Sequence, residues 1–270
     1  IRDSVASRGL GDVYKRQHIY NETGAYTPNL ERLVNQGLVF ENAYSQGPVC
    51  SVARSTLITG AYAPKIGAHY HRKTKLVPMP SNLKMFPSYL RNAGYYTSNN
   101  YKEDYNIVKS DNVWDESSSK ASYKDRNKNQ PFFHVQNFTI THEGKLHFTS
   151  EEMSENLTKR SLESIAVPPY LQDTKIVRYT IAKHYDLITE LDIQIGKFLD
   201  ELETQGLMDN TFVFYFGDHG GVLPRSKGYI YESGLKVPLI VYVPEKWKHL
   251  VPVQKGNRIN GFCSFSNTSV

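Results

Sequence analysis

The run Phe212-Val213-Phe214-Tyr215-Phe216 constrains the fold of this chain most, because it is apolar and aromatic without alternation. A strand of this kind is buried on both faces, which is typical of a parallel sheet covered by helices. The run ends in Gly217-Asp218-His219-Gly220, so a carboxylate and an imidazole follow the carboxyl end of the strand. Open α/β sheets bind ligands at that edge. We therefore expect a functional site beside Asp218 and His219.

Strand and helix patterns alternate along the rest of the chain. A long helix is expected over 173–205, where aliphatic residues recur at helical spacing and Gly206 gives a stop. The polar stretch 108–129 predicts a surface excursion. The alternation predicts an α/β fold with a mainly parallel sheet sandwiched by helices. The other expected helices span 28–36, 51–59 and 81–93, and the other expected strands span 39–45, 95–99 and 132–140.

The composition indicates a globular protein. A chain of 270 residues with 39% hydrophobic and 12% aromatic residues suits one large α/β domain, or one domain with an additional piece. The net charge of +5 fits either attraction of an anionic substrate or an uninformative surface balance. Lysine and arginine are scattered, no stretch is long enough to span a bilayer, and Cys50 and Cys263 alone give no disulfide framework. We therefore expect neither a nucleic-acid partner nor a membrane span.

Residues 50–60 form a second informative run, in which the thiol of Cys50 directly precedes a segment of helix-like composition. Arg54 follows one helical turn later, on the same face. The free N–H groups and partial positive charge of a helix N-terminus would hold an anion or oxyanion at position 50. A buried structural cysteine followed by an ordinary helix is the simpler interpretation. The residues alone leave both interpretations open.

The same run resembles the signature of the sulfatase family, which has Cys or Ser, any residue, Pro or Ala, any residue, Arg, and then Thr-Gly. Val52 departs from this pattern, since Pro or Ala is usual there. Further segments resemble the family and follow its order, so that the resemblance covers residues 18–245. These segments are residues 27–33, 37–44, 217–220 and 227–238.

The resemblance implies an alkaline-phosphatase-like fold and a sulfuric ester hydrolase that removes sulfate from a sulfated carbohydrate. In this family a formylglycine-generating maturation enzyme oxidises the cysteine to formylglycine, whose hydrated aldehyde attacks sulfur. Cys50 would be its precursor, and Arg54 would hold the aldehyde by charge-assisted hydrogen bonds. Asp218, His219 and residue 50 would bind one calcium ion, although imidazole is a poor calcium ligand. His219 would therefore bond a sulfate oxygen or indicate a different metal.

Further residues match or replace catalytic and substrate-binding positions of the family. Lys227 would contact sulfate and serve as an acid near the leaving oxygen, His142 would donate a proton, and Lys102 would keep the role of the family lysine. The simpler interpretations are a solvated loop lysine for Lys227 and a strand-end histidine for His142. Asp104 replaces the histidine of the family's Gly-Lys-x-His, and we assign it to substrate binding together with Arg72. A solvated basic loop is the alternative for Arg72.

The two ends of the chain differ from the family. Residues 1–17 show neither a family motif nor a signal-peptide pattern, and are expected to be a non-native segment. Residues 18–270 would form a partial catalytic domain, truncated at both ends, without the first strand and its paired metal-binding aspartates and without the C-terminal subdomain. The resemblance implies a periplasmic or secreted protein whose signal sequence is not in this chain. We expect the fragment itself to be inactive.

Two alternative functions remain open. Related hydrolases of the same fold also use a formylglycine, but they cleave phosphonates and phosphodiesters. A catalytically silent member would only bind sulfated glycans and would keep Cys50 as a plain thiol. Val52, Asp104 and the missing strand favour the silent member to some degree.

Overall fold

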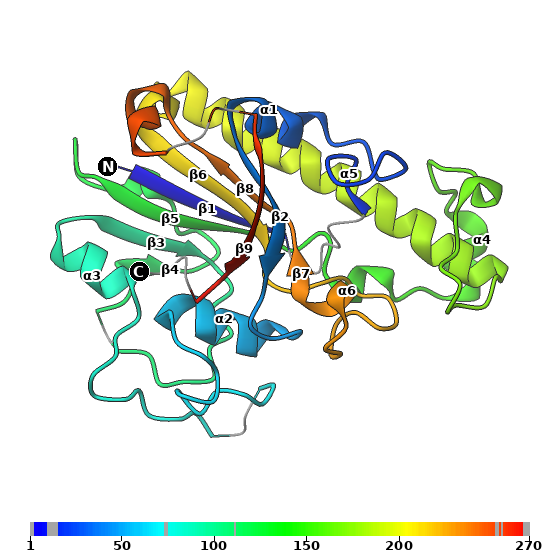
Figure 1. Ribbon diagram of the computed structural model, residues 1–270, viewed down its shortest axis with the longest axis horizontal. Coiled ribbons are helices and arrows are strands. Elements are labelled where there is room, and N and C mark those ends of the chain that lie inside the picture. Colours follow the sequence, from blue (N-terminus) through cyan, green and yellow to red (C-terminus); the bar gives the residue numbers. More distant parts are fainter. Residues whose placement is uncertain are drawn as a thin grey trace.

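A nine-stranded sheet forms the centre of the molecule. The computed structural model describes residues 3–9, 16–72, 75–110, 112–251, 254 and 256–266. Eight strands follow the order β4-β3-β5-β1-β6-β8-β2-β7, and β9 pairs with β2 (Figure 1). The strands are β1 (Asp3–Gly9), β2 (Gly37–Tyr44), β3 (Tyr96–Asn100), β4 (Glu116–Ser117), β5 (Phe132–Phe138), β6 (Thr211–Gly217), β7 (Lys236–Val237), β8 (Leu239–Tyr242) and β9 (Arg258–Ser264).

The half of the sheet from β4 to β6 is parallel. β3 pairs in parallel with β4 and β5, and β1 pairs in parallel with β5 and β6. β8 is antiparallel to both β6 and β2, whereas β2 and β9 are parallel. The mainly parallel sheet predicted from the sequence is confirmed. Because parallel strands end at the same edge, the segments that follow β5 and β6 are brought together.

Strand β1 lies at the centre of the sheet. Residues 1–17 were expected to be a non-native segment and the chain to lack the first strand with its paired aspartates; Asp3–Gly9 pairs with β5 on one side and with β6 on the other. A strand ladder is formed by backbone groups, so it requires no particular side-chain motif. The lack of a family motif in this segment was therefore no guide to its pairing. That residues 1–17 are non-native stays a prediction.

Helices cover both faces of the sheet. They are α1 (Pro28–Gln36), α2 (Cys50–Thr59), α3 (Pro87–Asn92), α4 (Ser150–Glu155), α5 (Lys175–Thr204) and α6 (Glu232–Leu235). The long helix expected over 173–205 is confirmed to within two residues at each end. Tyr215 of β6 packs in a cluster with α1 and α5, whereas the next residue, Phe216, packs in a cluster with α2. The strand is buried on both faces, as its unbroken apolar run predicted.

The helix expected over 81–93 is shorter than predicted. Only Pro87–Asn92 is helical, and residues 81–86 form turns and irregular backbone. Pro87 lacks an N–H group and clashes with the preceding turn in a helix interior, so it is tolerated only in the first turn. The apolar spacing of the segment therefore misled the prediction, because Pro87 sets the start of the helix.

The segment 108–129, predicted as a surface excursion, also contributes to the core. Val113, Trp114 and Tyr123 are at most 7% exposed. Trp114 stacks on Phe133 of β5, and Tyr123 stacks on Phe132 at the start of the same strand. A few large apolar residues anchor this polar segment at one end of β5, which the overall polarity of the sequence did not indicate.

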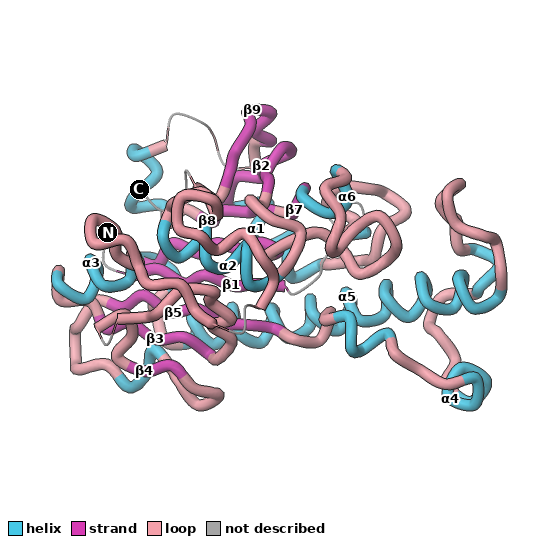
Figure 2. Tube along the Cα trace, turned by 90° about the horizontal axis from the view of Figure 1, so that it is seen from below, coloured by secondary structure: helices cyan, strands magenta, loops and turns pink. Residues whose placement is uncertain are grey.

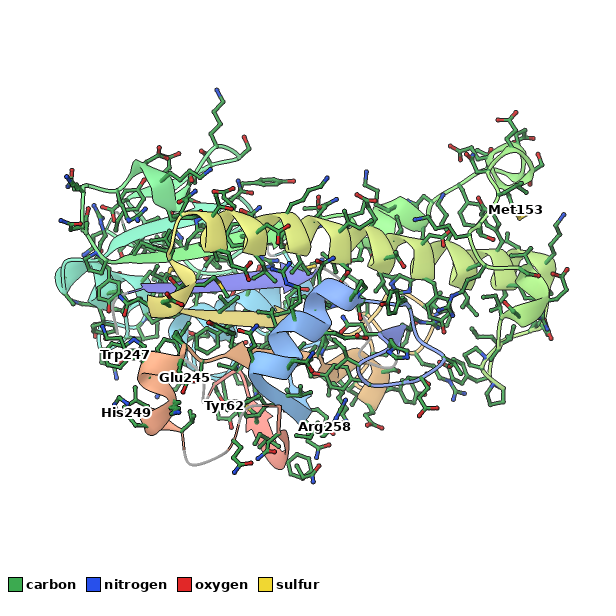
Figure 3. The ribbon with its side chains drawn as sticks, turned by 90° about the horizontal axis from the view of Figure 1, so that it is seen from above. Tyr62, Met153, Glu245, Trp247, His249 and Arg258 are labelled. Atoms are coloured by element: carbon green, nitrogen blue, oxygen red, sulfur yellow. The ribbon has the colours of Figure 1, made fainter. Side chains whose placement is uncertain are left out.

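The amino-terminal end of α5 projects beyond the sheet (Figure 2). Met153 of α4 lies at this end, whereas Trp247 and His249 lie at the opposite end of the molecule (Figure 3). Among the described residues, no helix has both the length and the apolar character that a membrane span requires.

Candidate active site

Cys50 is the first residue of α2 and is fully buried. The preceding residue, Val49, provides no side-chain cap, so the first N–H groups of the helix are not used by a capping side chain. The helix expected behind Cys50 is confirmed, and every residue from Cys50 to Ile58 is buried. The backbone therefore holds residue 50 rigidly at the edge of the sheet.

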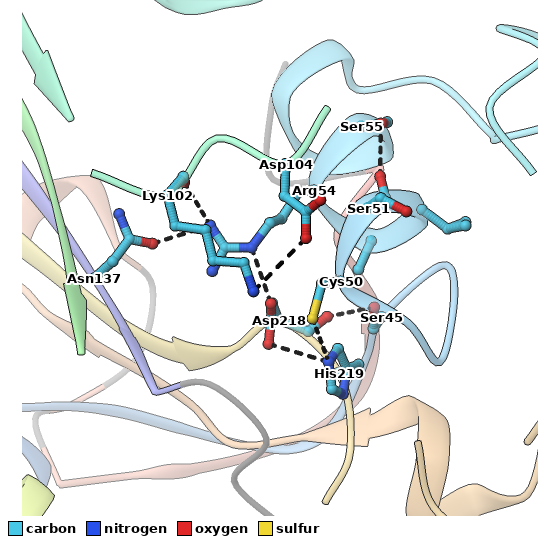
Figure 4. A network of polar contacts seen from close by, with 12 residues as sticks. Ser45, Cys50, Ser51, Arg54, Ser55, Lys102, Asp104, Asn137, Asp218 and His219 are labelled. Carbon is cyan, nitrogen blue, oxygen red and sulfur yellow. Dashed lines mark hydrogen bonds and ion pairs between the residues drawn. The ribbon is translucent and has the colours of Figure 1, made fainter. Parts of the chain in front are cut away.

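The loop after β6 brings Asp218 and His219 to Cys50 (Figure 4). His219 Nε2 lies 3.1 Å from Cys50 Sγ, and His219 Nδ1 donates to the carbonyl of Gly220 at 2.7 Å. A Cβ atom at Gly220 would lie only 1.9 Å from the carbonyl oxygen of Ser233, so only glycine allows this close approach. The close approach of Gly220 to Ser233 fixes the loop. The hydrogen bond from His219 Nδ1 to the Gly220 carbonyl then directs His219 Nε2 toward the thiol.

Arg54 joins three segments around the site. Its Nε donates to Asp218 Oδ2 at 3.0 Å, and its Nη1 donates to the Lys102 carbonyl at 2.8 Å and to Asn137 Oδ1 at 3.0 Å. The Nη2 atom of Arg54 is buried and has no hydrogen-bond partner within the described part of the chain. Arg54 thus orients Asp218 and retains one donor for a further acceptor.

Asn137 and Ser45 support this network and were missed by the sequence analysis. Asn137, on β5, also donates to the carbonyl of Asn100 at 2.6 Å. Ser45 Oγ donates to the Asp218 carbonyl at 2.7 Å. Asn137 could have been found from its position inside an apolar strand, because a buried polar side chain requires hydrogen-bond partners. Nothing in the local sequence distinguished Ser45.

The charges of the cluster reinforce one another. Burial, the largest single influence, opposes ionisation of Cys50, but the hydrogen bond from His219 and the charges of His219 and Lys102 together lower the pKa of the thiol. Burial likewise opposes protonation of His219, but the charge of Asp218 and the contact with Cys50 raise its pKa. Burial opposes ionisation of Asp218 too, yet His219, Arg54 and Lys102 hold its pKa well below the usual range. The site therefore favours a charged carboxylate and an imidazolium beside residue 50.

Lys102, Asp104 and Arg72 form an ion-pair chain at the edge of the cluster. Asp104 Oδ2 lies 3.6 Å from Lys102 Nζ, and Arg72 contacts both carboxylate oxygens of Asp104 at 3.2 Å. Burial alone would raise the pKa of Asp104, but the Arg72 hydrogen bonds and the Lys102 charge lower it. Arg72 is the more exposed partner, at 55%, so it lies where a ligand can reach it.

Ser51 connects α2 to the segment that carries Arg72. The backbone N–H of Arg72 donates to Ser51 Oγ at 3.1 Å, and Ser51 Oγ also forms a hydrogen bond with His71 Nδ1 at 2.9 Å. Burial, followed by the charge of Arg72, lowers the pKa of His71. The segment after α2 is thus attached beside residue 50.

Lys227 and His142 lie close enough for the charge of Lys227 to affect the pKa of His142. Lys227 Nζ pairs with Glu143 Oε1 at 2.7 Å. Burial, together with the charges of Lys102 and Lys227, lowers the pKa of His142, so its imidazole is neutral at neutral pH. His142 Nδ1 accepts from the Gly144 N–H at 3.3 Å, which leaves the proton on Nε2. His142 and Lys102 line a cavity of about 360 Å³.

Cys50, Asp218 and His219 offer three possible metal-ligand atoms within 4.8 Å of one another. Asp218 Oδ1 is buried, has no hydrogen-bond partner among the described residues and lies 3.7 Å from His219 Nε2. An unpartnered buried carboxylate oxygen fits a cation. Calcium takes roughly six to eight oxygen ligands, so these residues supply only part of a calcium shell. Conversion of Cys50 to an aldehyde hydrate would replace its sulfur by oxygen.

This fold and this edge-of-sheet cluster define an α/β protein with a candidate nucleophile position at a helix start. The sulfatase family model matches residues 10–185 and 149–267, and the chain belongs to the sulfatase family.

The chain is similar to sulfatases of both bacteria and animals. An ulvan-active sulfatase of Formosa agariphila is 37% identical over 268 residues, which cover 84% of this chain and 45% of that protein. The N-acetylgalactosamine-6-sulfatase of Homo sapiens is 24% identical over 316 residues, which cover 97% of this chain and 59% of that protein. The chain therefore spans about half the length of these curated relatives.

Solved structures share the fold. The structure of Ps i-CgsB in complex with k-i-k-neocarrahexaose has a TM-score of 0.71 and 17% sequence identity, and the match covers 99% of this chain and 70% of that chain. The alkaline-phosphatase-like α/β fold expected from the sequence is confirmed.

Proposed function

We propose that this protein is a sulfuric ester hydrolase that removes sulfate from a sulfated carbohydrate, with residue 50 as the nucleophile position. The observation that carries the proposal is the convergence of Cys50, Arg54, Asp218 and His219 at one sheet edge, with Arg54 Nη2 and Asp218 Oδ1 unpartnered among the residues described. Sulfated polysaccharides of the ulvan type are the proposed substrates, because the 37% identical relative is named for activity on ulvan.

Cys50 would first be oxidised to formylglycine by a maturation enzyme. The hydrated aldehyde would supply the oxygen nucleophile that attacks sulfur, which a thiol cannot replace without forming a stable thiosulfate. Arg54 Nη2, which has no hydrogen-bond partner among the described residues, would donate a hydrogen bond to an oxygen at residue 50. The buried position of α2 excludes bulk water from that oxygen.

The surrounding cations suit a sulfate ester. Lys102, Lys227 and Arg72 are placed around the cluster, and their positive charges would stabilise the sulfate oxygens. Neutral His142 carries its proton on Nε2, so it can donate a hydrogen bond to the leaving oxygen. Glu143 holds Lys227 in position through the ion pair at 2.7 Å.

A divalent cation, calcium in our proposal, would be held by Asp218, by residue 50 after its conversion, and by His219 once its Nε2 has released its proton. Such an ion would withdraw electron density from the sulfate group. Asp104 would anchor Arg72 and Lys102 and so orient the substrate-binding side of the site. We also propose a periplasmic or secreted location, as for enzymes that meet polysaccharides outside the cell.

The proposal is tested by sulfate release from ulvan oligosaccharides after co-expression with a formylglycine-generating enzyme. The expected inactivity of the chain by itself stays a prediction, which the unmodified chain tests in the same assay. We expect sulfate release to be abolished by Cys50→Ala and lowered about 100-fold or more by Lys227→Gln. The matched control is Lys248→Gln, since Lys248 is exposed and distant from the cluster in sequence.

The same samples are assayed on phosphonate and phosphodiester substrates. Faster cleavage of those esters would favour the phosphonate hydrolase alternative. Sulfate release that survives Cys50→Ala would contradict the proposed nucleophile.

A further inference from the structure

A second cavity, of about 440 Å³, is lined by residues of α5, of α6 and of the loops beside them. Its walls come from the segment after β1, from the segment before α5, from α5 itself and from the loop between β6 and α6. The volume is within the usual range for small-ligand sites. None of the residues assigned to the candidate active site lines it.

Arginine and tyrosine side chains give this cavity its chemical character. Arg225 Cζ lies 4.6 Å from the ring centroid of Tyr170 and 5.4 Å from that of Tyr231. Both tyrosines line the cavity and are exposed, at 41% and 51%. The guanidinium thus lies over both aromatic rings, and a guanidinium stacked on rings can still use its N–H edge for planar, bidentate contact with an anion.

The charge of the cavity is predominantly positive. Arg16 and Arg225 both line it, and Glu232, the one acidic lining residue, pairs with Lys236 at 3.5 Å. Arg225 has no ion-pair partner in the part of the chain that the structure describes. An exposed cation without a carboxylate partner, beside tyrosine faces on which the C–H faces of sugars can pack, fits an anionic saccharide.

The loop between β6 and α6 connects this cavity to the candidate active site. Ser226 and Arg225 line the cavity, whereas the next residue, Lys227, pairs with Glu143 of the active site. The Gly228 N–H donates to the Pro48 carbonyl, two residues before Cys50, at 2.9 Å. One short loop thus presents residues to both sites.

We propose that this cavity is a second subsite, which binds a sulfated unit of the same polysaccharide while another unit lies in the active site. The inference rests on the proposed function and adds the recognition of at least two saccharide units. Arg225 is the binding residue for the sulfate group, and Tyr170 and Tyr231 bind the sugar ring.

The test measures binding to the full chain by titration calorimetry, with a sulfated ulvan tetrasaccharide, its desulfated form and a sulfated monosaccharide as probes. Arg225→Gln is expected to weaken binding of the sulfated tetrasaccharide about tenfold or more, since charge-assisted hydrogen bonds are lost. It is expected to leave binding of the sulfated monosaccharide unchanged. Arg225→Lys should lose part of the affinity, because it keeps the charge without the planar fork. Lys248→Gln is the control and should change neither value.

Tyr231→Ser is a second variant, should Arg225→Gln fold poorly, and is also expected to weaken tetrasaccharide binding selectively. Unchanged tetrasaccharide affinity in the folded variants would overturn the subsite. Equal affinity of the unmodified chain for tetrasaccharide and monosaccharide would overturn it as well, but would leave the proposed function intact. Failure of the unmodified chain to bind any sulfated probe would overturn the proposed substrate class together with the subsite.

Discussion

At the scale of single residues, Arg54 determines how the candidate site is built. It is 0% exposed and binds a carboxylate, a backbone carbonyl and an amide from three different segments. A buried guanidinium is stabilised only when such partners are present, because its desolvation is costly. The structure therefore relies on Arg54 to position Asp218, and it leaves the Nη2 donor of Arg54 without a partner among the described residues.

We predict that Arg54→Met lowers the free energy of unfolding by about 3 kcal/mol or more, because Asp218 would remain buried without its guanidinium partner. The measurement is urea denaturation followed by circular dichroism. Arg72→Gln is the matched control, since it breaks a more exposed arginine–aspartate pair and is expected to cost about 1 kcal/mol or less. Equal stability of the two variants would contradict the role assigned to Arg54.

Sequence motifs predicted the residues of the site that react or bind, but not the residues that support them. Cys50, Asp218 and Lys227 stand in short segments with recognisable spacing. Asn137 contacts Arg54 across 83 positions, and Ser45 contacts Asp218 across 173 positions. Such contacts depend on which strands become neighbours in the sheet. The spacing of residues within a short motif contains no information about the order of the strands.

At the scale of elements, α2 and the turn before it are packed tightly. An ideal Cβ atom at Gly47 would lie 2.5 Å from Val52 Cγ1, so Gly47 makes room for the residue at which this chain departs from the family signature. Val52 is itself buried, at 6% exposure. The departure at position 52 is therefore accommodated by a glycine five residues earlier.

We predict that Gly47→Ala lowers the free energy of unfolding by about 1–3 kcal/mol, because overpacking forces a stiff β-branched side chain to move. The penalty should be smaller in a Val52→Ala background, which removes the clashing methyl group. A double-mutant cycle of thermal and urea unfolding measures this coupling. Strictly additive effects of the two substitutions would show that the predicted contact is absent.

Strand β5 contains a buried histidine whose titration makes stability depend on pH. His134 donates from Nε2 to Gln136 Oε1 at 3.2 Å and accepts from the Ser98 hydroxyl at 2.8 Å. Burial lowers its pKa from 6.5 to about 4. The folded state therefore favours the neutral imidazole. This contribution to stability is complete above pH 6.5 and is lost as the pH falls toward 4.

We predict that His134 contributes a loss of stability on the order of 3 kcal/mol between those pH values. His134→Gln should remove this part of the pH dependence, whereas His249→Gln, at an exposed position, should retain it. Urea denaturation at a series of pH values gives the slopes. Identical slopes for the unmodified chain and His134→Gln would contradict the prediction.

At the scale of the whole molecule, the functional edge exists because parallel strands end together. Cys50 and His219 are 169 positions apart, yet the ends of β2 and β6 place their side chains in contact. The alternation of strand and helix patterns was enough to predict the parallel, helix-covered sheet. It was not enough to predict β1, since pairing in the centre of the sheet uses backbone groups of a segment without recognisable motifs.

The account depends most on residue 50 as the precursor of the nucleophile. Its most direct test is the mass of the proteolytic peptide that contains residue 50, after expression with a formylglycine-generating enzyme. We predict a peptide in which the Cys50 thiol has been replaced by an aldehyde, and no such conversion in the Cys50→Ala variant. A peptide that keeps its thiol under these conditions would contradict the account and would favour a catalytically silent, glycan-binding member of the family.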